Sequence, residues 1–502
     1  MNPLLFQALQ SVSRRGNRSL FLVGGPPRDL LLNLPCHDWD LVGSKARSAA
    51  QALARRLKAR FIVLDEAFQI YRVVWRSSED ARPIIIDFAE LQGGSIEKDL
   101  ARRDFTINAM ALPISSFGKV PLEEHLIDPF GGQRDLKHRV LRAVSKKAFK
   151  EDPLRLLRAF RFSAQFNLSI APETARWIKT FCKPIQARYL GVAPERVREE
   201  LLRLLSQRIA GATLRVMERY GLLRNLFPEM EPGRRTAVRY YGSGGVLKHA
   251  LQTVSHLDWI LDQIQAQRFT RLFKTPEVSA GVQTYLAESI GGFPRSAWLK
   301  LAGFLHDIGK PATARMKNGR LRFFGHEEVG AALARKVMEG LRTSRQEVQV
   351  VRGWIRNHMR LGNLAASPRV TDKAIARFFR DLNGEGVGMI LVSLADHYGY
   401  LARPRWGKAK DPVERLAAYL WQSYFMQREK LQPPRLIDGT ILMRRLRLKP
   451  GPLIGRLLEE IQDAQLEGKV HTVQEAVAFA KKRLPHLRTL TPRPSPSTRR
   501  GE

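Results

Sequence analysis

The sequence contains little cysteine, comparatively few acidic residues and no long apolar run. Only Cys36 and Cys182 occur among 502 residues, which argues against a disulfide framework and fits a reducing compartment. No apolar run reaches the length needed to span a membrane, and the N-terminal residues lack the pattern of a secretory signal. We therefore expect a soluble, cytoplasmic protein without a membrane partner.

The shortage of acidic residues leaves a large positive net charge. The chain has 84 Lys and Arg against 48 Asp and Glu, which gives +36 at neutral pH. A field of this sign favours a polyanion, most simply nucleic acid, and makes binding strongly salt-dependent. General basicity of a high-pI proteome is the alternative explanation. The apolar content of 44% is typical of a folded protein, and the length predicts roughly three domains.

Hydrophobic periodicity divides the chain into an α/β part followed by helical parts. The N-terminal part alternates helical spacing, as in Ala46–Ala59, with short apolar runs that predict strands. These runs are Leu20–Val23, Phe61–Leu64, Ile70–Trp75 and Ile84–Phe88. After about residue 149 the spacing becomes helical and basic, and Arg403–Asp411, rich in charge with Pro and Gly, predicts a hinge. We expect a mixed-sheet head at 1–148, a helical neck at 149–232, a helical body at 245–400, a helical tail at 411–488 and a disordered end at 489–502.

Two acids lie close together behind a glycine pair. Asp38 and Asp40 are two residues apart in a predicted strand, so both carboxylates face one side of it. Paired hard oxygen ligands suit Mg²⁺. Upstream, Gly24-Gly25 allows close approach of a phosphate, which Arg28 is placed to grip. A solvated acidic turn after a glycine-rich loop is the alternative for the Asp-x-Asp pattern alone. A helical turn is expected between the two strands, over Leu30–Leu34.

Further polar residues of the head suit a nucleotide. A clamp of two metals on a transferring phosphoryl group needs a third carboxylate, and Asp87, which ends an apolar strand, is the best candidate. The paired Arg102 and Arg103 suit a triphosphate, while Asp104 and Asn108 suit ribose hydroxyls. We expect a buried helical segment after Asp104. The alternatives are a strand-end cap at Asp87, a turn cap at Asn108 and a solvated Arg102.

A basic helix is predicted to begin near Pro153, with Asp152 as its N-terminal acid. Arg155, Arg158 and Arg161 follow at intervals of three and lie on neighbouring parts of one face. Asp152 and Arg155, one turn apart, offer an acceptor and a donor to the Watson–Crick edge of a base. A capping acid and a plain basic face are the alternative.

Taken in order, these motifs resemble the class II tRNA nucleotidyltransferases and bacterial poly(A) polymerases, whose head is polymerase β-like. The resemblance covers about residues 20–230. It implies that Asp38, Asp40 and Asp87 hold catalytic Mg²⁺, and that Asp152 and Arg155 read the incoming base. It places the remaining nucleotide contacts at Gly24, Gly25, Arg28, Arg102, Arg103, Asp104, Asn108 and Arg158. The sequence departs from the family at Pro26-Pro27, which lack backbone N–H donors for phosphate.

A second set of residues has the order H…HD…H…H…D. Imidazole and carboxylate together suit a borderline divalent transition metal. The set consists of His249, His306, Asp307, His326, His358 and Asp396. It resembles the HD-type metal phosphohydrolases over about residues 245–400, with His306-Asp307 expected on an apolar helix that ends at Gly309. A degenerate module that serves only to bind tRNA is the alternative.

The resemblance implies an enzyme that adds CCA to the 3′ acceptor end of tRNA from CTP and ATP, with a possible second phosphohydrolase activity. An A-adding enzyme or a poly(A) polymerase shares the head motifs. Two alternatives of another class are an HD phosphohydrolase with a vestigial head and a non-catalytic RNA-binding protein. The intact set of Asp38, Asp40 and Asp87 argues against both of these.

Overall fold

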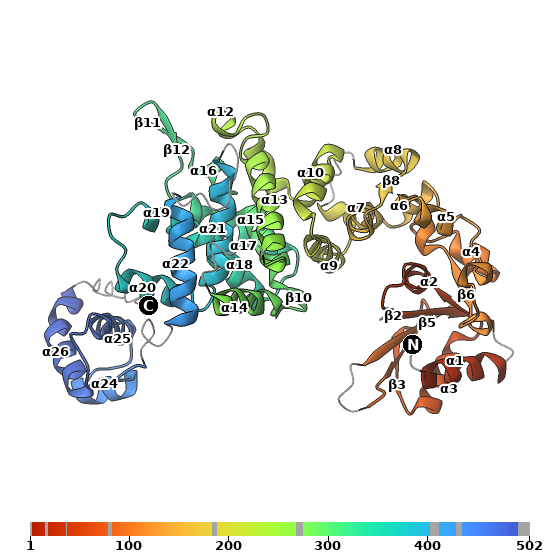
Figure 1. The fold of residues 1–502 in the computed structure, drawn as a ribbon, viewed down its shortest axis with the longest axis horizontal. Helices are drawn as coiled ribbons and strands as arrows, with labels where there is room; N and C mark the ends of the chain where they lie inside the picture. The colour runs from red at the N-terminus through yellow and green to blue at the C-terminus, as the bar shows by residue number, and fades with distance from the viewer. Residues whose placement is uncertain are drawn as a thin grey trace, which may run out of the picture. The chain divides into compact units, whose positions relative to one another are not determined.

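The computed structural model describes residues 3–15, 19–36, 38–78, 83–182, 188–267, 275–401, 411–427 and 434–489. The chain forms two compact units, Met1–Pro228 and Glu229–Glu502, whose elements are labelled in Figure 1. The predicted hinge at 403–411 and the predicted disordered end at 489–502 lie outside the described residues, apart from Asp411 and Thr489. None of the described helices has the length and hydropathy that a membrane span requires.

The first unit is built on a six-stranded mixed sheet with the order β3-β4-β5-β2-β1-β6. Only β2 and β5 run parallel, while the other neighbours are antiparallel. The strands are β1 (Leu20–Val23), β2 (Asp38–Gly43), β3 (Arg60–Asp65), β4 (Ile70–Trp75), β5 (Ile84–Glu90) and β6 (Ala111–Pro113). The four apolar runs predicted as strands are therefore β1, β3, β4 and β5. The predicted fold class, a mixed-sheet head followed by helices, is confirmed.

Two helices, α1 (Pro3–Arg15) and α3 (Ala46–Leu57), lie beside the sheet (Figure 1) and bury apolar side chains in a core shared with it. The core between them includes Leu9, Leu53 and, from the strands, Trp39 and Phe88. Because side chains alternate along a strand, the burial of Trp39 directs Asp40 to the other face of β2. That face is the one on which the candidate site lies.

Two local predictions about the head were wrong. The segment after Asp104 forms a 3₁₀ turn (Thr106–Asn108) and then β6, rather than a helix. A short apolar run is ambiguous by periodicity, and pairing of β6 with β1 decides its state. The helix expected at Leu30–Leu34 is α2 (Gly25–Leu31), which begins earlier because Pro26 and Pro27 are tolerated in a first turn.

The remainder of the first unit is helical. Helices α4 (Ile96–Leu100) and α5 (Gly132–Lys137) complete the head, and β7 (Val140–Leu141) pairs with β8 (Ser169–Ile170). The neck consists of α6 (Lys147–Glu151), α7 (Leu154–Phe166), α8 (Pro172–Phe181), α9 (Pro194–Leu205), α10 (Ala210–Tyr220) and α11 (Leu222–Leu226). Packing of α9 on α7 brings polar side chains of the two helices together.

Helices of the second unit pack around a central helix, α21 (Gly386–Gly399), which is apolar on nearly all sides and therefore buried. Its neighbours are α13 (Gly245–Gln265), α15 (Arg295–Leu305), α18 (Arg345–Asn357), α19 (Arg360–Ala365) and α22 (Pro412–Met426). Further elements are α12 (Val238–Tyr241), α14 (Pro276–Ala287), β9 (Ser289–Ile290), β10 (Phe293–Pro294), α16 (Lys310–Thr313), β11 (Arg315–Lys317), β12 (Arg320–Arg322), α17 (His326–Gly340) and α20 (Asp372–Asp381). The tail helices α24 (Gly439–Leu446), α25 (Pro452–Leu466) and α26 (Val473–Thr489) share a core of their own.

Candidate active site and candidate metal centre

A polar cavity of about 680 Å³ lies between the head sheet and the neck helices α7 and α9. This volume is in the range of small-molecule binding sites. The predicted site residues that line the cavity are Gly24, Gly25, Arg28, Asp40, Arg103, Asp104, Asn108, Asp152, Arg155 and Arg158. The structure thus brings together residues from β1 through α7 that are far apart in the sequence.

Asp40 and Asp87 lie on adjacent parallel strands, directly opposite each other in register. Directly opposite residues share one face of a sheet, so both acids project from the face that does not carry Trp39. Arg72 of β4 donates two hydrogen bonds to Asp87, 2.7 Å and 2.8 Å long. Asp38, the first residue of β2, lies opposite Ile85 in register. Neighbouring carboxylates are a donor set that fits Mg²⁺.

Gly24 brings the backbone close to the acids. Its φ of +77° is a conformation that favours glycine. A Cβ atom at this position would lie 3.1 Å from Nη1 of Arg103 and 3.3 Å from Oδ2 of Asp40. The missing side chain therefore leaves room for a ligand between a guanidinium and a carboxylate. Pro26 and Pro27 offer no N–H donors, whereas the side chains of Arg28 and Arg103 line the cavity here.

A chain of buried polar contacts connects α2 to the neck. Arg28 donates to Asn108 (2.6 Å), whose amide donates to Asp104 (3.0 Å). Arg158 binds the other oxygen of Asp104 at 2.7 Å. Burial would raise the pKa of Asp104, but Arg158 and Asn108 outweigh it and hold the pKa below its usual value. Asp104 is therefore a charged anchor that orients both arginine-bearing elements.

Arg28, Arg158 and Arg161 also use partners that the sequence did not suggest. Glu200 of α9 accepts from Arg158 (2.9 Å) and from Arg161 (2.5 Å). The guanidinium of Arg28 lies 4.4 Å from the ring centre of Phe166, which is a cation–π distance. In the sequence, Glu200 could have been recognised as an acidic residue beside the apolar residues of α9.

Protein contacts hold the two candidates for base recognition. Asp152 accepts from the backbone N–H of Leu154 and from Arg196, at 3.2 Å and 2.7 Å. Arg155 donates to the carbonyl oxygens of Ala148 and Arg102, at 3.1 Å and 2.7 Å. Arg102 does not line the cavity; its side chain donates to Gln92 on the surface. Arg196 was not predicted, and it is placed to orient Asp152.

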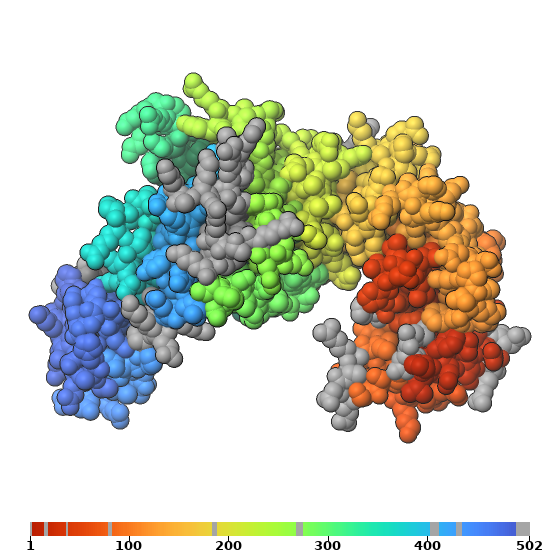
Figure 2. Space-filling view, viewed as in Figure 1, coloured from red at the N-terminus to blue at the C-terminus, as the bar shows by residue number. Residues whose placement is uncertain are grey.

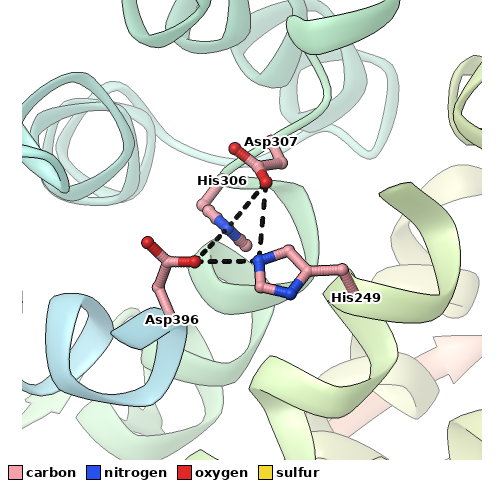
Figure 3. A group of neighbouring side chains, drawn as sticks. All are labelled: His249, His306, Asp307 and Asp396. Atoms are coloured by element: carbon pink, nitrogen blue, oxygen red, sulfur yellow. Dashed lines mark hydrogen bonds and ion pairs between the residues drawn. The ribbon is translucent and has the colours of Figure 1, made fainter. Parts of the chain in front are cut away.

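A second candidate site lies inside the second unit, where ligands from α13, α21 and the ends of α15, α17 and α18 meet. All six predicted residues, His249, His306, Asp307, His326, His358 and Asp396, are buried. The helix expected to end at Gly309 instead ends at Leu305. His306 and Asp307 follow it directly, and Figure 3 shows their side chains converging with those of His249 and Asp396.

The six side chains form two groups that share Asp307. In the first, Nε2 of His306 lies 3.2 Å from Oδ2 of Asp307 and 3.3 Å from Oδ1 of Asp396. Nε2 of His249 lies 2.8 Å from that same Asp396 oxygen. In the second, Oδ1 of Asp307 faces Nε2 of His326 at 3.4 Å and Nε2 of His358 at 3.7 Å. The two oxygens of one carboxylate thus serve different groups.

Backbone carbonyls fix the orientation of three imidazoles. Nδ1 of His306, His326 and His358 lies 2.7–2.8 Å from the carbonyl oxygens of Gly303, Phe323 and Ile355, respectively. A carbonyl only accepts, so Nδ1 carries the proton and Nε2 of the neutral ring presents its lone pair inward, as in metal-ligating histidines.

The buried atoms at the centre fit a cation. Nε2 of His326 and His358 are 3.3 Å apart, and two lone pairs at this distance repel unless a proton or a metal lies between them. Nε2 of His306 and Oδ1 of Asp307 have no hydrogen-bond partner among the described residues. Burial lowers the pKa of His306, but Asp307 and Asp396 outweigh it and raise the value to about 10, so Nε2 of His306 carries a proton unless a metal ion takes its place. Nitrogen and carboxylate donors in this arrangement suit a divalent transition metal.

Lys310 lies at one side of this centre, where it was not predicted to act. Its ammonium group donates to Asp307 (2.5 Å), to the hydroxyl of Tyr241 (2.7 Å) and to that of Tyr400 (3.2 Å). Burial lowers the pKa of Lys310, but Asp307 and the other charges nearby raise it above its usual value. A fixed positive charge beside a metal centre favours an anionic substrate.

Four known family models match successive parts of the chain. The Poly A polymerase head domain matches residues 20–142, and the "Probable RNA and SrmB- binding site of polymerase A" matches 167–233. The HD domain matches 276–418, and tRNA nucleotidyltransferase domain 2 matches 432–480. The A-adding tRNA nucleotidyltransferase of Deinococcus radiodurans is 31% identical over 92% of this chain and 94% of its own. The chain belongs to the class II tRNA nucleotidyltransferase and poly(A) polymerase family.

Two further matches agree with the assignment of this chain to the class II family. The CC-adding tRNA nucleotidyltransferase of Thermus thermophilus is 32% identical, over 92% of this chain and 93% of its own. A solved complex of a CCA-adding enzyme with ATP has the same fold, with a TM-score of 0.61 and 23% identity over 96% of this chain and 95% of its own. The family resemblance recognised from the motifs is therefore confirmed.

Substitution of Gly24 tests whether a nucleotide phosphate must come close to the backbone at this position of the nucleotidyltransferase head. We expect Gly24→Ala to raise the KM for nucleotide about tenfold, because the new Cβ meets Arg103 and Asp40 and the backbone is strained. Gly94→Ala is the matched control, since Gly94 has φ +81° and open space around it. Steady-state kinetics should show the KM change in Gly24→Ala alone; an equal change in both variants would contradict the role.

Glu200 is expected to stabilise the neck of the nucleotidyltransferase. Glu200→Ala leaves Arg158 and Arg161 without their shared buried acceptor, which should cost about 3 kcal/mol. Glu199→Ala, which removes an exposed pair with Arg203, should cost less than about 0.5 kcal/mol. Hydrogen exchange of the α7 amides measures both local opening free energies. Equal values would show that Glu200 contributes no more than a surface acid.

Proposed function

We propose that this chain extends the 3′ end of tRNA with CCA, using CTP and ATP. The observation that carries the proposal is a single cavity that is lined by Gly24, with Asp40 and Arg103 beside it, and by Asp152 and Arg155. It combines acids for metal, cations for triphosphate and a donor–acceptor pair for a base. The net charge of +36 supports an RNA partner.

In the proposed reaction, the 3′-oxygen of the RNA forms a bond to the α-phosphorus and loses its proton. The bond between that phosphorus and the bridging oxygen breaks, and pyrophosphate leaves. Asp38, Asp40 and Asp87 would hold Mg²⁺, which supplies charge neutralisation of the phosphates and activation of the attacking oxygen. Arg28 and Arg103 bind the triphosphate, because their guanidinium groups line the cavity beside Gly24 and Gly25.

Base selection is assigned to Asp152, which follows α6, and to Arg155 in the first turn of α7. Asp152 offers an acceptor and Arg155 a donor to the base edge, while Arg196 and the carbonyl of Arg102 hold these side chains in place. Asn108 accepts from Arg28 and donates to Asp104, and both Asp104 and Asn108 are proposed to contact the sugar. Arg158 holds Asp104 and so positions this group.

A narrower product is the second candidate, because the two relatives compared above are an A-adding and a CC-adding enzyme. Poly(A) synthesis is the remaining alternative of the same class. Purified protein is given tRNA lacking its last three nucleotides, or ending in CC, with CTP and ATP together, one of them labelled. Stopping after three additions supports CCA synthesis. Three other results contradict CCA synthesis. They are addition of A to the CC end and nothing else, addition of C to the shortened end and nothing else, and synthesis of a long A tract.

We also propose that the HD centre hydrolyses phosphate esters with divalent transition-metal ions held by the two groups of buried ligands. The converging Nε2 atoms and the fixed charge of Lys310 support this activity. A metal there supplies activation of water and charge stabilisation, while Lys310 binds the phosphate. Release of product from a cyclic phosphodiester should be lost in His306→Ala; no activity in the metal-loaded parent would leave a module that only binds RNA.

A further inference from the structure

Between the HD motif and the next histidine ligand, the chain forms a two-stranded hairpin. Strands β11 and β12 are joined by Asn318-Gly319, whose φ values of +50° and +66° are those of the tight turn favoured in hairpins. The hairpin extends from the helices of the second unit, as Figures 1 and 2 show. Most of its residues are exposed, so the core gains little from it.

The two faces of the hairpin differ sharply. Arg315 pairs with Arg322, and Lys317 with Arg320, so one face carries four cations in two directly opposed pairs. The other face carries Met316 opposite Leu321. No acidic side chain in the described part of the chain forms an ion pair with these four cations. Directly opposed like charges destabilise a hairpin, and a bound polyanion would relieve this repulsion.

The base of the hairpin forms part of the wall of the HD centre. The carbonyl oxygen of Phe323, next to β12, accepts from Nδ1 of His326 at 2.8 Å. The ring centre of Phe323 also lies 5.6 Å from the ammonium nitrogen of Lys310. A strand bound along the hairpin would therefore lead to the metal ligands and to the lysine that faces them.

Phe324 extends the cationic surface with an aromatic one. Its side chain is 69% exposed, and Lys317 lies over the ring at 5.3 Å. Exposed aromatic rings beside a basic track stack on the bases of single-stranded nucleic acid. The combination of phosphate-binding cations with one exposed ring favours RNA over an anionic membrane, because only Met316, Leu321 and Phe324 would be available to insert.

We propose that this hairpin, residues 315–324, binds a single RNA strand and directs its terminal phosphate ester to the HD centre. The proposal rests on the hydrolase activity proposed above and specifies its substrate as an RNA end rather than a free nucleotide. Water adds to the phosphorus, the bond to one ribose oxygen breaks, and that oxygen receives a proton.

The test compares Arg320→Glu/Arg322→Glu with the control Arg444→Glu/Arg445→Glu, which alters two exposed arginines of α24. Each full-length, metal-loaded protein is given a short RNA with a 2′,3′-cyclic phosphate end and, separately, a mononucleotide 2′,3′-cyclic phosphate. We expect the hairpin variant to raise KM for the RNA at least about tenfold. It should also lower the slope of log KM against log salt concentration by about two. Hydrolysis of the mononucleotide should stay within about twofold, and the control should match the parent. Equal loss on both substrates, or no loss on RNA, overturns the proposal.

A binding measurement separates this proposal from the hydrolase activity itself. In His306→Ala, a short RNA carrying a photoreactive uridine should cross-link to residues 315–324, and the hairpin substitutions should abolish the cross-link. Cross-linking without hydrolysis in the parent would reject the hydrolase and retain the RNA surface. Absence of the cross-link overturns the inference, as does hairpin-dependent binding to anionic phospholipid vesicles without RNA binding.

Discussion

Asp40→Asn is expected to reduce nucleotide incorporation at least about 1000-fold, which corresponds to about 4 kcal/mol of transition-state stabilisation. The substitution keeps the shape of the side chain but removes the charge that a metal needs. Asp40 lies opposite Asp87 in register and within reach of Gly24, where the triphosphate is proposed to bind. Incorporation of labelled CTP or ATP into shortened tRNA measures the loss.

The control for this prediction is Asp65→Asn at the end of β3 in the same sheet. Asp65 accepts from the backbone N–H of Phe68 and does not line the cavity, so incorporation should change by less than about twofold. Asp40→Asn should leave metal binding in the HD centre unchanged. An Asp40→Asn protein with parental incorporation would exclude the catalytic assignment of β2.

Asp307→Asn is expected to have the largest effect on metal content, because Asp307 is the one residue that both ligand groups share. The HD centre of the parent protein should bind two divalent transition-metal ions, that of His326→Ala should retain one, and that of Asp307→Asn should retain neither. Elemental analysis after removal of free metal measures the stoichiometry. Asp307→Asn also leaves Lys310 without its buried counter-charge, which should destabilise the metal-free second unit by about 3 kcal/mol.

A substitution in the tail provides the control for the measurement of metal content. Glu460→Gln removes a carboxylate that binds Arg483 in the tail, and its metal content should equal that of the parent. A parent whose HD centre binds one ion, with that of His326→Ala binding none, would show that the two groups form a single site. Nucleotide incorporation should persist in all these variants, because the acids of the head are unchanged.

Local sequence patterns correctly predicted the helices and strands whose conformation depends on residues nearby in the chain. The strands Leu20–Val23 and Ile70–Trp75 agree to the residue, because each is a short, mainly apolar segment flanked by polar residues or glycine. The segment that follows Asp104 was assigned to the wrong state because pairing of β6 with β1, far earlier in the chain, determined it. The same limit applied to the helix predicted to end at Gly309, which ends directly before His306 and Asp307.

The sequence by itself determined the family, the fold class and the residue types of both sites, because motif order and side-chain chemistry survive without coordinates. Only the tertiary structure decided which partners those residues have. It joined Glu200 to two arginines of α7, divided the oxygens of Asp307 between two ligand groups, and placed four cations on one face of a hairpin beside His326. These contacts connect segments distant in the chain or set the face of a strand, and their energies depend on distance and burial, which residue order does not contain.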